Sequence, residues 1–140
     1  MSSFSEIDYQ RQLIVSSLDD FTPNAALPNV YGGQFGGSTD MWKRAVIEFL
    51  CVNVKCGLIE AIHRKELSAN EGAHRLKNIL ICGGDENHID MDIVWNALYF
   101  NSTPRLDEIL ERLNMRTWEA LKLDLSGTFI AELKDVYGHN

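Results

Sequence analysis

The chain has 140 residues, of which 45% are apolar and 24% are charged, and its formal net charge is −7 at pH 7. This length and composition are those of one globular domain, so we expect a single domain over residues 1–140 and exclude an intrinsically disordered chain. No apolar run approaches the roughly 18 residues of a membrane-spanning helix, and the N-terminal sequence lacks the basic and apolar regions of an export signal. We therefore expect a cytoplasmic protein that is not associated with a membrane.

The N-terminal part of the chain predicts two helices joined by a long loop. Apolar residues recur on one helical face at Phe4, Ile7, Ile14 and Leu18. This spacing predicts an amphipathic helix over residues 5–19. Residues 21–38 contain two prolines and four glycines, which favour a loop. The sequence Ser-Thr-Asp at residues 38–40 then offers N-cap side chains for a second helix.

The second helix is predicted to be the central helix of the fold. Its apolar face is expected at Trp42, Ala45, Val46, Phe49 and Leu50, and the stripe broadens beyond Val52. Gly57 is expected to be a weak point or a site of close contact, because glycine has no side chain and loses more conformational freedom than other residues when it enters a helix. Residues 54, 56, 58 and 62 are apolar and alternate as in a strand. Helix and strand therefore both remain open for residues 54–66.

Residues 68–104 predict two more helices. The sequence Ser-Ala-Asn-Glu at residues 68–71 is a capping box, which opens a helix with Ala73, Leu76, Ile79 and Leu80 on its apolar face. The glycines at 83 and 84 are expected to end this helix. A further helix is expected over residues 93–98, which are apolar except for Asn96.

The C-terminal part continues the helical pattern. Pro104 occupies the expected first position of a helix with Leu106, Ile109, Leu110 and Leu113 on one face. Thr117 is an expected cap for a helix containing Trp118, Leu121 and Leu125, and Gly138 is an expected stop for the last one. The tryptophans lie within apolar stripes and are expected in the core. The sequence thus predicts an all-α fold, a single compact bundle of about five to seven helices with a long Gly/Pro-rich loop at about residues 21–38.

The glycine-rich sequence YGGQFGGSTD in this loop does not fit a phosphate-binding loop. Against the pattern G-x-x-x-x-G-K-[ST] it matches Gly32, Gly37 and Thr39 but has Ser38 where the lysine must stand. Pro28 interrupts the preceding segment, whereas the motif follows a buried strand. We therefore expect no nucleotide binding. A loop of this length inside a compact domain is often functional, so contact with a partner remains open.

No side-chain set in the sequence predicts nucleophilic catalysis. Cys51 and Cys56 lie on a stretch expected to be buried, where a thiol is unreactive, and Cys82 has no partner in a CxxC motif. His63 and His74 are expected on exposed helix faces among lysines and arginines. We expect a protein that is not an enzyme and that has no cofactor.

The sequence DENHIDMD contains five side chains of the types that bind metals: Asp85, Glu86, His88, Asp90 and Asp92. A calcium loop counted from Asp85 would need glycine at its sixth position and an acid at its twelfth, where the chain has Asp90 and Asn96. We therefore expect no metal site. An acidic entry to a helix explains the same residues, because carboxylates are favoured near the positive end of the helix dipole.

From residue 40 onward the sequence resembles the small helical immunity proteins of contact-dependent growth inhibition and related bacterial toxin systems. The resemblance lies in FLCVNVKCGLIEAI, an apolar helix that closes on a Gly-Leu-Ile turn, followed by a short capped helix and the tract DMDIVWNALYFNSTPRLDEILERL. It implies a non-enzymatic cytoplasmic protein that binds the C-terminal domain of one cognate toxin and blocks it. Many such toxins are basic nucleases.

Local charge places the expected toxin contact in residues 78–104, which contain four acids and no lysine or arginine. Acidic stretches repel nucleic acids and attract basic proteins. The predicted partner-binding residues are Asp85, Glu86, Asp90, Asp92 and Tyr99. If this tract is not the contact, the loop around Tyr31 and Phe35 is the next candidate.

Two alternatives from other classes remain open at the level of sequence. One is a small metal-dependent hydrolase that uses His88 and neighbouring carboxylates. The other is an acidic adaptor protein that binds a larger assembly through the same surface.

Overall fold

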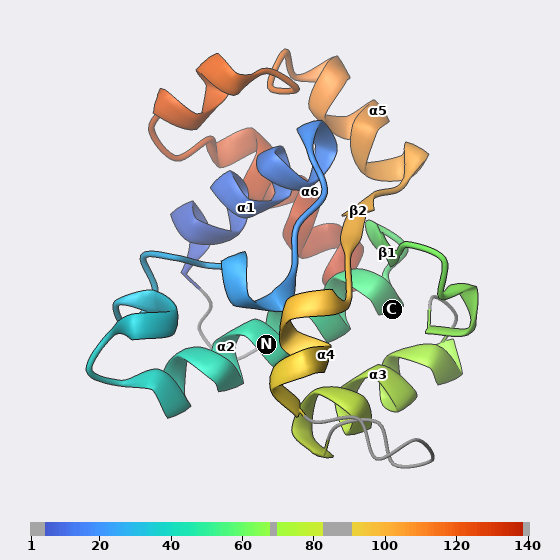
Figure 1. Ribbon diagram of the computed structural model, residues 1–140. Helices are drawn as coiled ribbons and strands as arrows, with labels where there is room; N and C mark the ends of the chain where they lie inside the picture. The colour runs from blue at the N-terminus through green and yellow to red at the C-terminus, as the bar shows by residue number, and fades with distance from the viewer. Residues whose placement is uncertain (1–4, 68–69, 83–90, 139–140) are drawn as a thin grey trace.

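A computed structural model describes residues 5–67, 70–82 and 91–138, which form a mostly helical fold with one small sheet (Figure 1). The elements, in chain order and with η for a 3₁₀ helix, are α1 (Glu6–Leu18), η1 (Pro23–Ala25), η2 (Gly33–Phe35), α2 (Thr39–Lys55), β1 (Ile59–Ala61), η3 (Lys65–Leu67), α3 (Asn70–Cys82), α4 (Met91–Ala97), β2 (Phe100–Ser102), α5 (Pro104–Arg112), η5 (Trp118–Lys122) and α6 (Gly127–Gly138). The predicted helical bundle is confirmed, with six α-helices among the described residues.

The helices form two neighbouring groups (Figure 1). The first helix, α1, contacts α5, η5 and α6, while α3 contacts both α2 and α4. The strands β1 and β2 lie between these groups in the view and pair antiparallel. Buried apolar side chains from all six α-helices belong to one hydrophobic cluster. Within the described ranges, no helix combines the length and the apolar character that crossing a membrane requires.

The bounds predicted for the first helix are confirmed, but its buried face differs from the predicted stripe. Ile14 is fully buried, whereas Ile7 and Leu18 are only half-buried, and Phe4 lies outside the described residues. The fully buried Leu13 was not part of the stripe. The spacing of apolar residues did not predict the buried face correctly, because four of its buried residues are polar: Gln10, Gln12, Ser16 and Ser17.

Two buried glutamines of α1 hold loops from distant parts of the chain. The Gln12 side-chain oxygen accepts a hydrogen bond from the backbone of Leu27 at 2.9 Å. The Gln10 side chain donates to the carbonyl of Asp124 at 3.1 Å and accepts from the backbone of Ser126 at 2.8 Å. A buried side-chain amide is costly without partners, so these loops and α1 stabilise one another.

The loop at residues 21–38 is confirmed, and it is attached to the core at two places. Phe21 and Phe100 exchange backbone hydrogen bonds of 3.0 and 2.8 Å next to β2. Farther along, the Trp42 indole donates to the carbonyl of Ala26 at 3.0 Å. The rest of the loop forms the left edge of the molecule in Figure 1.

The second helix, α2, contributes more buried apolar side chains than any other described helix, which agrees with its predicted central place. It is not the most buried helix, because a larger share of the residues of α1 is buried. Phe49 is fully buried and meets the Tyr9 ring edge-to-face, with ring centroids 4.8 Å apart. Asn53 is also fully buried; its amide donates to the Phe49 carbonyl at 2.8 Å, and its oxygen accepts from the Tyr137 hydroxyl at 2.7 Å. Ser38 occupies the N-cap position, but its side chain makes no capping hydrogen bond.

Residues 54–66 contain a helix end and a strand, and are not helical throughout. The helix α2 ends at Lys55, and Gly57 has φ +72°, the left-handed conformation that ends many helices and that glycine adopts without strain. The chain then enters β1, which pairs with β2 in the register Ile59↔Ser102. The strand alternative is therefore correct for this short segment.

The next two helices meet α2 around Trp95. Its indole donates to the carbonyl of Leu80 at 3.0 Å, and its ring lies 5.6 Å from that of Trp42. Both tryptophans are buried, as predicted. The predicted capping box at 68–71 begins outside the described residues, and the glycines at 83 and 84 also lie outside them.

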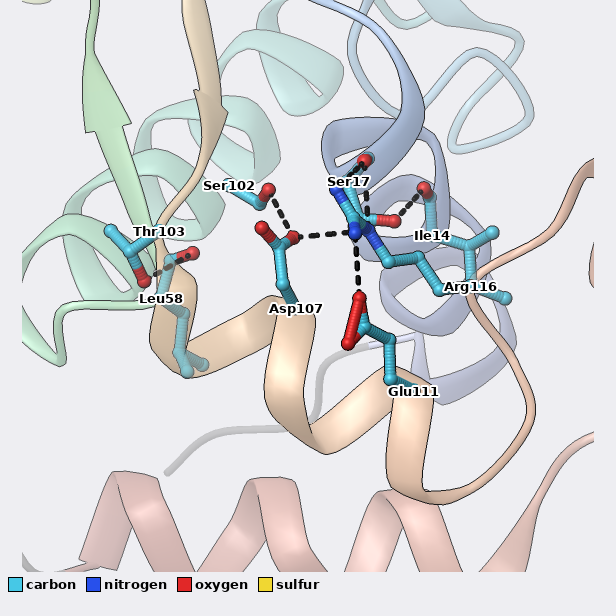
Figure 2. A network of polar contacts seen from close by, with 8 residues as sticks. All are labelled: Ile14, Ser17, Leu58, Ser102, Thr103, Asp107, Glu111 and Arg116. Carbon is cyan, nitrogen blue, oxygen red and sulfur yellow. Dashed lines mark hydrogen bonds and ion pairs between the residues drawn. The ribbon is translucent and has the colours of Figure 1, made fainter.

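The predicted start of α5 at Pro104 is confirmed, and two side chains beside it donate hydrogen bonds to the segment that follows α2. The Thr103 hydroxyl donates to the carbonyl of Leu58 at 3.3 Å (Figure 2). The Arg105 guanidinium donates to the carbonyl of Cys56 at 2.6 Å. These contacts place β1 next to the first turn of α5.

Arg116 connects the end of α1 to α5 (Figure 2). Its guanidinium donates twice to the carbonyl of Ser17, at 3.2 and 3.3 Å, and once to Glu111 at 2.7 Å. It also lies 3.4 Å from Asp107, which accepts a hydrogen bond from Ser102. The last carbonyls of a helix lack partners within it and carry partial negative charge, so this cation stabilises the end of α1.

The core position predicted for Trp118 is wrong. Thr117 does cap the segment, accepting from the backbone of Ala120 at 3.2 Å, but the segment is the short 3₁₀ helix η5. A 3₁₀ helix has three residues per turn, so the α-helical spacing does not apply, and Ala120 is buried instead. The Trp118 side chain is 54% exposed, and Leu125, expected on the same stripe, is also exposed. The last helix, α6, is confirmed.

Candidate functional site

Of the five residues predicted to bind the toxin, the structure places only Asp92 and Tyr99, one near each end of α4. Asp85, Glu86 and Asp90 are outside the described residues, and Asp92 lies in the first turn of α4, where its side chain is not described. Tyr99 follows the last turn of this helix. At 1.5 Å per residue, the helix separates the backbones of Asp92 and Tyr99 by about 10 Å.

Tyr99 is exposed, as its predicted role in partner binding requires. Its side chain is 48% exposed, whereas Phe100 is fully buried, because successive residues of extended chain point to opposite sides. The Tyr99 carbonyl accepts from the backbone of Ile62 at 2.8 Å, which holds this end of α4 beside β1. Asp20, Arg64 and Tyr99 all line one hollow, so the surroundings of Tyr99 carry both signs of charge.

The outer face of α4 exposes an apolar residue between these two ends. Ile93 was expected on the apolar side of the helix, but it is 57% exposed, while Val94, Trp95 and Leu98 are buried. Ile93, Val94 and Trp95 are consecutive and therefore point to different sides of the helix, and packing against α3 buries only one of these sides. The exposed surface of α4 and the residues after it therefore includes an apolar side chain, Ile93, in addition to Tyr99.

A second exposed apolar surface lies on the 21–38 loop and the start of α2. We define the loop surface as Tyr31, Phe35 and Met41, which are all exposed. The Phe35 side chain is 91% exposed, more than any other large apolar side chain of the described residues. Met41 lies in the first turn of α2 and was not singled out from the sequence, because it directly precedes the predicted apolar face that begins at Trp42.

Closely packed glycines build the turn that carries Phe35. Gly32 and Gly33 have φ values of +83° and +73°, which suit glycine. The backbone of Gly33 donates to the carbonyl of Val30 at 2.9 Å, and that of Gly36 donates to Gly33 at 3.2 Å. A Cβ atom at Gly36 would overlap the Tyr31 carbonyl oxygen. The turn also contacts α2, so the exposed ring stands on an ordered support.

A cavity of about 540 Å³ lies behind the loop surface, between the start of α1, the loop and α2. Tyr31 and Met41 line it together with the carboxylates of Asp8 and Glu48 and the guanidinium of Arg44. Two of these three charges are negative. An apolar rim with acids beside it can bind an apolar side chain and a basic group of the same partner.

The thiols show no sign of activation. Burial raises the pKa of the Cys51 thiol to about 11, although Lys77 opposes this shift, and burial also raises the pKa of the Cys56 thiol. Since the thiolate is the nucleophile, raised pKa values reduce the reactivity of both groups at neutral pH. Cys82 is exposed at the end of α3.

We expect the protein to lose stability as the pH rises above about 9. Burial raises the pKa of Cys51 from 9.0 to about 11 and also raises the pKa values of Tyr9 and Tyr137 above their usual 10.0. The unfolded chain then releases these protons at a lower pH than the folded one, so the stability present below pH 9 falls as the pH increases. Urea unfolding at about pH 8 and about pH 11 measures the loss. Cys51→Ala should show a smaller loss over this interval than the parent chain, and an equal or larger loss would contradict the assignment.

Within the described ranges, no three His, Cys, Asp or Glu side chains are grouped so that they can hold a metal ion. His88, the residue on which the metal-hydrolase alternative rests, lies outside those ranges together with Asp85, Glu86 and Asp90. Neither His63 nor His74 has an acid among the hydrogen bonds and ion pairs found for it in the described structure, and both side chains are exposed, as expected.

Comparisons of this chain with protein-family models, curated protein sequences and solved structures give no match. The resemblance to immunity proteins therefore rests on the sequence patterns given above.

Proposed function

We propose that this chain is a non-enzymatic immunity protein that binds and neutralises a cognate toxin domain, a basic nuclease, in the cytoplasm. The observation that carries the proposal is the position of Phe35, whose ring is 91% exposed on an ordered turn of glycines. Neighbouring Tyr31 and Met41 extend the exposed apolar area. A cluster of exposed apolar side chains marks a binding surface more often than an isolated one does.

The geometry of the loop surface suits tight binding. Aromatic residues are enriched among the few side chains that contribute most to the affinity of protein interfaces. A turn that is already ordered before binding loses less conformational entropy when the partner docks. Inhibition by occlusion needs no catalytic group, so slow release from such an anchor is sufficient for protection.

The charges around the loop surface favour a basic partner. Asp8 and Glu48 line the cavity behind it, and Asp40 precedes Met41 at the start of α2. Residues 1–42 carry one arginine against five acids, so the surrounding chain is acidic as well. Complementary charge raises the association rate with a basic domain. The acids at 85–92 and Tyr99 remain a predicted second region of contact.

The proposal predicts that Phe35→Ala abolishes protection while leaving the fold intact. The chain and its variants are expressed together with the toxin domain encoded by the gene immediately upstream, and the growth of the cells and the dissociation constant of the purified pair are measured. Loss of one aromatic anchor should weaken binding by about 2–4 kcal/mol, or about 30- to 1,000-fold. The matched control is Trp118→Ala, which removes another exposed aromatic side chain, on η5, and should change the dissociation constant less than about twofold.

Two results would contradict the proposal. The first is that the purified chain does not bind the toxin domain. The second is that Phe35→Ala and Trp118→Ala weaken binding equally, because the loop surface would then have no special part in recognition.

A further inference from the structure

A groove of about 890 Å³ runs between α2 and α3, on a part of α2 that also borders the cavity behind the loop surface. Its apolar lining comes from both helices: Ile47 and Val52 of α2, and Ala73 and Ile81 of α3. Ile81 is 46% exposed, whereas Leu76, Ile79 and Leu80 of the same helix pack against the core. The groove therefore presents an apolar strip that the described part of the chain does not cover.

The sides of the groove are basic, in contrast to the molecule as a whole. Arg44 and Lys55 line it from α2, and Lys77 lines it from α3, all three with exposed side chains. Glu48 is the only acid among the described lining residues. The protein carries a net charge of −7, so this local excess of cations is opposite in sign to the overall field.

The dimensions of the groove match a helix. The α2 wall runs from Arg44 to Lys55, which is about 16 Å or three turns at 1.5 Å per residue. Two adjacent helices with an apolar strip between them form the groove into which an amphipathic helix packs. The basic side chains along both walls would then lie next to the residues that border the apolar face of the bound helix.

We propose that the α2–α3 groove binds an amphipathic helix of a partner protein whose apolar face is flanked by glutamate or aspartate. Charge complementarity argues for this occupant: the apolar face covers Ile47 and Ile81, and the flanking carboxylates meet Lys55 and Lys77. The proposal does not depend on the proposed toxin, because it follows from the walls of the groove alone. It gives the protein two surfaces of opposite preference, the loop surface for a basic partner and the groove for an acidic helix.

The first test uses two synthetic peptides of about 18 residues, which form about 27 Å of helix. Both have leucine along one face and alanine on the other, and they differ only in having glutamate or lysine on the flanks. Fluorescence anisotropy of the labelled peptides measures their affinity for the full chain. The glutamate peptide should bind at least about tenfold more tightly than the lysine peptide, a difference of about 1.4 kcal/mol. The overall charge of −7 predicts the reverse order, so a preference for the lysine peptide would overturn the proposal.

Cys51 provides a second readout within the groove. It lines the groove and is half-buried, whereas Cys56 is buried and Cys82 is exposed elsewhere on α3. In a Cys82→Ser background, a saturating amount of the glutamate peptide should slow alkylation of Cys51 at least about fivefold, because a covered thiol is inaccessible to the reagent. An unchanged rate would show that the peptide binds elsewhere and would overturn the proposal.

Matched substitutions locate the contact. Lys77→Glu and Lys55→Glu reverse one charge on each wall and should each weaken binding of the glutamate peptide by about five- to tenfold. Lys134→Glu makes the same charge change on α6, where the exposed lysine lies 3.7 Å from Glu6, and should have less than about a twofold effect. Circular dichroism and thermal melting identify any variant that fails to fold. The two groove variants lie on different helices, so each one tests the groove independently of the other. An equal effect of Lys134→Glu and the folded groove variants would overturn the proposal.

The apolar strip is tested in the same way. Ile81→Ser should weaken binding of the glutamate peptide by at least about fivefold, whereas Ile93→Ser removes an isoleucine that is 57% exposed on α4 and should have no effect. If both serine variants bind the peptide as tightly as the parent chain, the groove is not the docking site.

Discussion

Phe49→Ala is expected to lower the free energy of unfolding by about 3–5 kcal/mol, because it removes a large side chain from the core. Phe49 is fully buried at the centre of α2 and contacts residues from separate segments of the chain. Its ring centroid lies 4.8 Å from that of Tyr9 on α1 and 6.5 Å from that of Phe21 on the loop. Alanine would leave a cavity between these rings, and close-packed neighbours relax into such a cavity only in part.

Phe35→Ala is the matched control, because it makes the same chemical change at a side chain that is 91% exposed. It should alter the free energy of unfolding by less than about 0.5 kcal/mol. Urea denaturation followed by circular dichroism measures both values with one method. A loss below about 1 kcal/mol for Phe49→Ala would mean that α1, α2 and the loop do not share one core at this position. The pair of variants also separates stability from binding, since only Phe35→Ala is expected to abolish protection without unfolding the chain.

Gly36→Ala is expected to disrupt the turn that carries Phe35 and to weaken toxin binding at least about tenfold, or about 1.4 kcal/mol. The backbone at Gly36 has an ordinary φ of −78°, so conformational strain is not the cause. The cause is space: an added Cβ would overlap the Tyr31 carbonyl oxygen and lie 2.7 Å from the Gly32 Cα. Both neighbours are backbone atoms, so the turn must open to accept the methyl group. Forced overpacking of this kind costs about 1–3 kcal/mol.

Gly37→Ala is the control for this prediction, since a Cβ at Gly37 would meet nothing within 4 Å. It should leave both binding and stability close to those of the parent chain. Hydrogen exchange reports on the turn without any partner, because the Gly33 and Gly36 amides are held by hydrogen bonds of 2.9 and 3.2 Å. These amides should exchange faster in Gly36→Ala and unchanged in Gly37→Ala. Unchanged exchange in Gly36→Ala would contradict the structure of the turn, whatever the identity of the partner.

The sequence by itself determined the helical class and most helix boundaries, because both depend on local patterns. Pro104 marks the start of α5, Gly57 follows the end of α2, and the glycine- and proline-rich residues 21–38 form a loop. Backbone preferences of proline and glycine act on their immediate neighbours and need no information from the rest of the chain. The exposure of Tyr31 and Phe35 could be predicted from the sequence for the same reason. Both aromatic residues lie among glycines in a loop, and so neither is part of the apolar face of a helix.

Tertiary packing decided which side of each helix is buried and which surfaces remain open. Gln10 and Gln12 lie in the core because distant loops supply their hydrogen-bond partners, and Ile93 is exposed because α3 covers another side of α4. Trp118 is exposed because its segment became a 3₁₀ helix. The basic groove requires Lys55 of α2 and Lys77 of α3 to line the same hollow, an arrangement that exists only once the helices have packed. Local patterns specify elements, whereas burial and charge complementarity depend on residues far apart in the chain, and that is why only the folded structure reveals the groove.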